Sequence, residues 1–201
     1  MVRILVLSVM ALAFLAGSMT ATEYKIDAKA SNLKWVGEKV LGKHWGTVNI
    51  KDGGMTKSGN NFNGNFTIDM TTLKVDDLED AGTNAKLVGH LKSDDFFSVA
   101  KYNTSTFKLK GIKDYTPKKD EKGNHWVTGD LTIKGITHEI GFPAEISFDS
   151  NGFKANANFT INRTKWDIRY GSGSFFDNLG DKTIKDDIKF ELKLVGNIIQ
   201  S

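Results

Sequence analysis

Hydrophobic and polar residues alternate along most of the chain beyond residue 22. Between Phe62 and Met70, every second residue is apolar or glycine, and the intervening residues are asparagine, threonine or aspartate. Residues 136–148 and 153–161 follow the same pattern, with few exceptions. A period of two is typical of strands that have one buried and one solvated face. The pattern therefore predicts a protein built mainly from β-strands.

Turn-forming residues separate these segments. Asp52-Gly53, Lys134-Gly135 and Asn151-Gly152 each stand between two alternating stretches. Such pairs favour tight turns between antiparallel strands. The chain has room for about eight strands or more, a number typical of small closed barrels. A sandwich of two sheets stays open, because periodicity does not distinguish it from a barrel.

Small residues occur on the predicted apolar faces, among them Gly64, Gly129, Ala155 and Ala157. A fully packed barrel interior is more often filled by branched side chains. We therefore expect a cavity whose walls are largely aromatic.

Residues 83–107 interrupt the strand pattern. Asn84 is expected to cap a short helix that runs to Leu91, and Ser93 to cap a second helical turn. Phe96 and Phe97 follow directly, and two adjacent phenylalanines favour an apolar flap over the end of the β structure. The alternative is a helix that only closes the core.

The first residues have the three parts of a secretory signal. Arg3 is followed by an apolar run from Ile4 to Ala16 and then by small residues. The run is too short to span a bilayer. We predict a signal peptide over residues 1–21, cleaved after Ser18 or Ala21, and a periplasmic or secreted protein with one domain over residues 22–201.

Composition and the absence of certain motifs exclude several classes of function. The net charge is +3, and the basic residues are interleaved with acidic ones, so nucleic acid is not an expected partner. The absence of cysteine excludes disulfides, thiol nucleophiles and thiolate metal sites. No nucleophile, metalloprotease or phosphate-loop motif occurs, and the four histidines are scattered. We expect no catalytic residues, no metal and no required cofactor.

Arg163 is unusual because it continues an otherwise apolar face. At the rim of a barrel, its guanidinium group would suit an anionic head group. Arg163→Met is then expected to keep the fold and to weaken binding of an anionic lipid. The alternative is a structural ion pair with Asp167 or Asp181. His138, near a turn on the same type of face, is a further rim candidate.

Three stretches resemble one family. They are HLKSDDFFSVAKYNTSTFKL (90–109), GDLTIKGITHEIGFPAEI (129–146) and INRTKWDIRYG (161–171) with Asn178-Leu179-Gly180-Asp181. Together they resemble the YceI-like family. The resemblance implies an extended, lipocalin-like, eight-stranded antiparallel barrel, with short helices near residues 83–97. It also implies an exported bacterial protein that binds polyisoprenoids or related lipids, and a possible homodimer. The insertion around residues 170–180 departs from the family pattern, so the shape of the opening and the head group stay open.

The main hypothesis is a carrier for a prenyl phosphate, an isoprenoid quinone or a fatty acid derivative, with transient contact to a membrane surface as a possibility. The alternatives are an enzyme that uses His138 or His90 as a base, and a stress-related structural protein with a filled core. The head-group candidates are Arg163, His138 and His90. The predicted apolar lining comprises Phe66, Ile68, Leu91, Phe96, Phe97, Phe107, Phe142, Phe159, Ile161, Trp166, Phe175, Phe176 and Phe190.

Overall fold

The computed structural model describes residues 21–199. This part of the chain has nine strands, one α-helix and three short 3-10 helices. The strands are β1 (Thr22–Ile26), β2 (Asn32–Lys39), β3 (Lys43–Ser58), β4 (Asn61–Asp69), β5 (Thr104–Asp114), β6 (His125–Ile133), β7 (Ile136–Phe148), β8 (Gly152–Asn162) and β9 (Ile184–Ile198). The helices are η1 (Met70–Thr72), α1 (Ala81–Lys92), η2 (Arg163–Trp166) and η3 (Gly180–Lys182).

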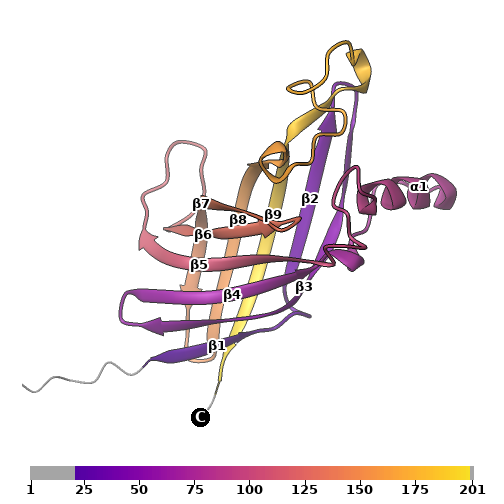
Figure 1. Ribbon diagram of the computed structural model, residues 1–201. Coiled ribbons are helices and arrows are strands. Elements are labelled where there is room, and N and C mark those ends of the chain that lie inside the picture. The colour runs from indigo at the N-terminus through magenta and orange to yellow at the C-terminus, as the bar shows by residue number, and fades with distance from the viewer. Residues whose placement is uncertain (1–20, 200–201) are drawn as a thin grey trace, which may run out of the picture.

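The strands form a closed antiparallel barrel, as predicted (Figure 1). From β2 the order runs through β9, β8, β7, β6, β5 and β4 to β3, and β3 pairs with β2 to complete the ring. Strand β1 adds no position to this ring. It pairs with β3 around Met55 and with β9 around Ile198, whereas β2 pairs with the same two strands farther along, around Trp45 and Lys189. Strands β1 and β2 therefore share one position, and nine strands make an eight-stranded barrel.

The helix predicted in residues 83–107 is present as α1, but its predicted caps are wrong. The Asp80 carboxylate accepts from the backbone N–H of Thr83 at 2.8 Å and caps the helix. Asn84 lies inside the helix, where its side-chain amide donates to the carbonyls of Val75 and Leu78. Ser93 ends α1 rather than beginning a second helical turn, and a hydrogen-bonded turn follows through Phe97.

The stretch before α1, residues 74–80, is a loop whose backbone pairs with β3. The backbone N–H of Asp76 donates to the carbonyl of Trp45 on β3, and the N–H of Lys74 donates to Thr47. Gly46 permits this approach, because a Cβ there would lie 1.9 Å from the carbonyl oxygen of Lys74. The stretch therefore covers the first half of β3, which β4 does not reach.

Aromatic side chains close the end of the barrel that contains β1. The rings of Tyr24 and Phe153 lie 5.5 Å apart, and Phe148 contacts both of them and Phe62. Tyr24, Phe62 and Phe153 are buried. The interior is therefore sealed at this end.

Candidate functional site

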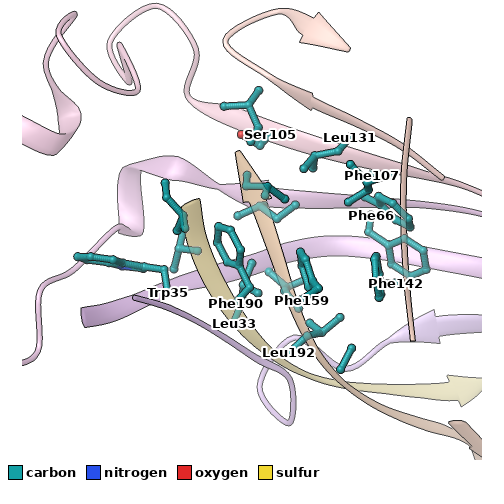
Figure 2. A pocket seen from close by; sticks show the side chains of 18 of the residues that line it. Leu33, Trp35, Phe66, Ser105, Phe107, Leu131, Phe142, Phe159, Phe190 and Leu192 are labelled. Carbon is teal, nitrogen blue, oxygen red and sulfur yellow. The ribbon is translucent and has the colours of Figure 1, made fainter. Parts of the chain in front are cut away.

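The barrel encloses a cavity of about 230 Å³ (Figure 2). Its walls come from strands β2 to β9, from α1 and from the turn after α1. Almost all of the lining side chains are apolar, because the inward positions of the alternating strands meet in the lumen. In the part of the chain that the structure describes, no helix is long and apolar enough to cross a membrane.

Five phenylalanine side chains line the lumen in a row and Trp35 lies at one end of it; we call these six residues the aromatic belt (Figure 2). Phe159 is stacked between Phe142, at 4.4 Å between ring centroids, and Phe190, at 5.3 Å. Phe107 continues the row from Phe142, and Phe66 lies opposite Phe107 in the strand register. Trp35 lies opposite Phe190. The belt thus consists of Trp35, Phe66, Phe107, Phe142, Phe159 and Phe190.

The belt does not fill the interior. Phe66, Phe107, Phe159 and Phe190 point into the lumen but are only partly buried, because they border the cavity. Interiors that are packed to ordinary protein density have few voids larger than a water molecule. The cavity therefore argues against a completely filled core.

Two of the small residues have a different role from the one predicted. A Cβ on Gly129 would lie 2.4 Å from the ring of Phe107, and one on Gly64 would lie 2.7 Å from the carbonyl oxygen of Gly54. These glycines accommodate a ring of the belt and a neighbouring strand. Ala155 and Ala157 do line the cavity, as expected.

Polar lining residues gather where β2, β3 and β9 extend beyond the other strands. We call this region the polar end; it comprises Glu38, Lys39, His44 and Lys185. The carboxylate of Glu38 accepts from Lys185 at 2.6 Å and from Lys189 at 2.5 Å. Hydrogen bonds from these two ammonium groups lower the pKa of Glu38 to about 2. Two lysines therefore share the carboxylate of Glu38 at this end, and the carboxylate of Asp77 lies 2.8 Å from Nδ1 of His44.

Arg163 lies close to this end, but it is not an open rim residue. Its side chain is 1% exposed. Nε donates to the carbonyl of Lys185, Nη1 to Ile168 at 2.7 Å, and Nη2 to Ile184 and to the carboxylate of Asp186 at 3.5 Å. Four of the five N–H groups are thus used within the protein. The structural ion pair is made with Asp186, and neither predicted partner is correct.

Ten of the predicted lining residues border the cavity. Five of them lie outside the belt, and three of these five, Leu91, Phe96 and Phe97, place α1 and the turn after it in the cavity wall. The complete set is Phe66, Ile68, Leu91, Phe96, Phe97, Phe107, Phe142, Phe159, Ile161 and Phe190.

Three predicted lining residues lie elsewhere. Trp166 is buried in the core, where its indole N–H donates to the carbonyl of Leu131. Phe175 and Phe176 are 45% and 50% exposed, and the guanidinium group of Arg169 covers the ring of Phe175. Loop residues have no strand period, so the sequence did not indicate which way these rings point.

The two predicted head-group histidines also lie outside the lining. The Nε2 of His138 donates to the carbonyl of Lys165 at 2.9 Å and links β7 to η2. The ring of His90 packs edge-on against Phe96 and Tyr170, which joins α1 to the loop after η2. Within residues 21–199, no group of three or more His, Cys, Asp or Glu side chains is arranged to hold a metal ion.

Trp35 and the polar end line the cavity but are not among the residues predicted from the sequence. Trp35 follows Leu33 at the strand period, so it could have been assigned to the lining. Lys39 and Lys185 carried no such signal, because a lysine at a strand end is usually solvated. With this geometry, the site can surround an apolar chain and place a polar group beside cations.

Comparison with known proteins agrees with the geometry. The YceI-like domain matches residues 24–196. A UPF0312 protein of Yersinia enterocolitica is 30% identical over 172 residues, which cover 77% of this chain and 81% of that protein. Protein YceI of Escherichia coli O157:H7 is 31% identical over 144 residues, 67% of each chain.

Solved structures share the fold. BcnA of Burkholderia cenocepacia superposes with a TM-score of 0.59 at 20% identity, over 85% of this chain and 98% of that one. A polyisoprenoid binding domain from Saccharophagus degradans gives 0.59 at 15% identity, over 88% and 98%. The barrel, its apolar lumen and the match over most of the described residues lead to one conclusion: this chain belongs to the YceI-like family.

Proposed function

We propose that the protein binds a polyisoprenoid or a similar long-chain amphiphile in the barrel lumen, for transport, storage or sequestration. The aromatic belt carries this proposal, because six rings from six strands border a cavity with almost no polar wall. Burial of apolar surface would supply most of the binding free energy, at about 25 cal/mol per Å². One structural relative is described as a polyisoprenoid binding domain.

The lipid chain would lie along the belt toward the end sealed by Tyr24 and Phe153. Its head group would remain at the polar end, near Lys39 and Lys185. The cavity of about 230 Å³ is smaller than the roughly 300–1,000 Å³ of typical ligand sites, so a long chain requires side chains to move apart. Phe96 and Phe97 lie in a turn outside the sheet and can move without breaking strand pairing.

We also propose that the protein is exported and that it requires no cofactor. A homodimer is part of the same proposal. The export signal is the apolar run at residues 4–16. The enzyme hypothesis has no specific observation in its favour, because His90 and His138 lie outside the cavity lining.

Native purification, organic extraction and mass spectrometry test the proposal. We expect the wild-type protein to release a long-chain lipid. Phe159→Trp should reduce the lipid recovered by about tenfold or more, because the added volume intrudes between Phe142 and Phe190. Tyr115→Trp adds an indole outside the cavity and should leave the yield unchanged. The absence of lipid from the wild-type extract, together with failure to bind added prenyl lipids, would refute the proposal.

A further inference from the structure

Exposed apolar side chains gather beyond the polar end of the cavity. Val40 and Leu41, in the turn between β2 and β3, are 54% and 70% exposed. Phe175 and Phe176, in the loop between η2 and η3, are 45% and 50% exposed. We call these four residues the apolar tip. In Figure 1, the turn and the loop lie at the same end of the molecule, at the top of the view.

Backbone pairing holds the two parts of the tip together. Lys39 lies opposite Ile184 in the register of β2 and β9, and the N–H of Val40 donates to the carbonyl of Thr183 at 3.2 Å. The loop is fixed in turn by Ser172, which bridges to Ile184 and is fully buried. The fold therefore presents the tip on paired backbone.

The tip continues the wall of the cavity. Lys39 and Ile184 line the cavity and pair with each other, and Val40 is the next residue along the chain. The apolar tip therefore adjoins the polar end of the cavity, with Lys39 between them. Its position suits the transfer of a lipid, because apolar side chains stand directly beside the end of the cavity where the lipid would enter.

The charge around the tip fits an anionic surface. Segments 39–43 and 169–183 contain four cations, Lys39, Lys43, Arg169 and Lys182, and two anions, Asp177 and Asp181, which gives a net charge of +2. Arg169 also pairs with Asp167 outside these segments, so the net charge nearest the tip is smaller. Lysines beside exposed aromatic and aliphatic residues are typical of proteins that bind the surface of anionic membranes.

We propose that the apolar tip docks on the surface of a lipid membrane and directs the polar end of the cavity toward it. The proposal rests on the proposed function, because a membrane is the source or destination of the lipid cargo. Four side chains are too few for a stable protein interface, which takes about 20–30 residues from each partner. A few apolar residues and nearby lysines are sufficient for reversible contact with a membrane.

Flotation with lipid vesicles tests this proposal. We expect the protein to float with vesicles of phosphatidylcholine that contain phosphatidylglycerol, and less with pure phosphatidylcholine. Phe175→Ser with Phe176→Ser should lower the vesicle-bound fraction by about tenfold, and Leu41→Ser should lower it less. Ile199→Ser is the matched control, because Ile199 is 49% exposed but lies beside β1, at the other end of the barrel.

A separate measurement distinguishes failure of this proposal from failure of the proposed function. The Phe175/Phe176 double variant should still bind a prenyl lipid added from ethanol, with an unchanged melting temperature. The docking proposal is overturned if the wild-type protein floats with neither vesicle, or if the double variant floats as well as wild type. It is also overturned if the two phenylalanines instead mediate self-association, which light scattering would detect.

Discussion

At the scale of single residues, Arg163 links three parts of the chain. Its guanidinium group bonds to carbonyls in the segment after η2 and at the start of β9, and it faces the ring of Phe96 at 5.9 Å. Burial lowers the pKa of Arg163, and the nearby carboxylate of Asp186 opposes this change. A guanidinium group keeps its charge at neutral pH even so. The charge is retained in the interior because its donors are almost all satisfied.

Arg163→Met should therefore destabilise the fold, contrary to the expectation from sequence. The variant would remove the guanidinium donor from three carbonyls and from Asp186, which would keep only its hydrogen bond from Ser174. Breaking a buried pair costs about 3–5 kcal/mol, which corresponds to a fall in melting temperature of roughly 10 °C for a chain of this size. Arg169→Met is the matched control, since its ion pair is 53% exposed on both sides and contributes less than about 1 kcal/mol. A melting temperature unchanged by Arg163→Met would contradict this structural role.

At the scale of elements, α1 and the turn after it supply a part of the cavity wall that lies outside the strands. Leu87 and Leu91 face the lumen from the helix, and Phe96 and Phe97 face it from the turn. His90 connects this wall to the inserted loop through Tyr170. The beginning of α1 depends on a single side-chain cap, the carboxylate of Asp80.

Asp80→Ala should weaken the first turn of α1. We expect hydrogen exchange of the amides there to accelerate by roughly threefold to tenfold. Hydrogen bonds from Thr83 lower the pKa of Asp80 below its usual 3.8, so the cap contributes at neutral pH and its contribution is lost as the pH falls below that value. Glu79→Ala removes a neighbouring exposed carboxylate that caps nothing, and equal effects of the two substitutions would exclude the cap.

At the scale of the whole molecule, the two ends of the barrel differ. One end is sealed by Tyr24 and its aromatic neighbours, whereas the other carries the polar end and the apolar tip. This asymmetry gives the proposed ligand one direction of entry. Under the proposed function, this asymmetry is useful where the protein meets lipid, so the location of the protein in the cell bears on the proposal.

Export is therefore a prediction at this scale. The predicted signal, residues 1–21, lies outside the described residues except for Ala21. We expect the mature protein to begin after Ser18 or Ala21, in the periplasmic or secreted fraction. N-terminal sequencing of the protein from its native host checks this expectation. Replacing an apolar residue of the run, as in Leu12→Arg, should retain the precursor in the cytoplasm. Recovery of a chain that still begins at Met1 outside the cytoplasm would contradict cleavage.

The sequence by itself determined which strand residues face inward. Five of the six belt residues were predicted, because alternation is a local property of the strand and survives whichever strand becomes its neighbour. The same pattern predicted antiparallel strands in a number typical of a barrel, but it did not distinguish a barrel from a sandwich. It did not predict that β1 and β2 share one position, because this depends on pairing with β9, more than 140 residues away in the sequence.

Only the tertiary structure decided the roles of residues outside the strand period. Arg163, Trp166 and Phe175 follow the end of β8, where no repeat relates sequence position to direction. Their surroundings come from distant segments: the start of β9 surrounds Arg163, and β6 accepts the hydrogen bond of Trp166. The polar end likewise exists only because β2 and β9 bring Glu38 and Lys185 together. The face on which a strand residue lies follows from local strand geometry. The contacts of a side chain, its burial and the opening of the cavity follow from contacts between segments that are far apart in the chain.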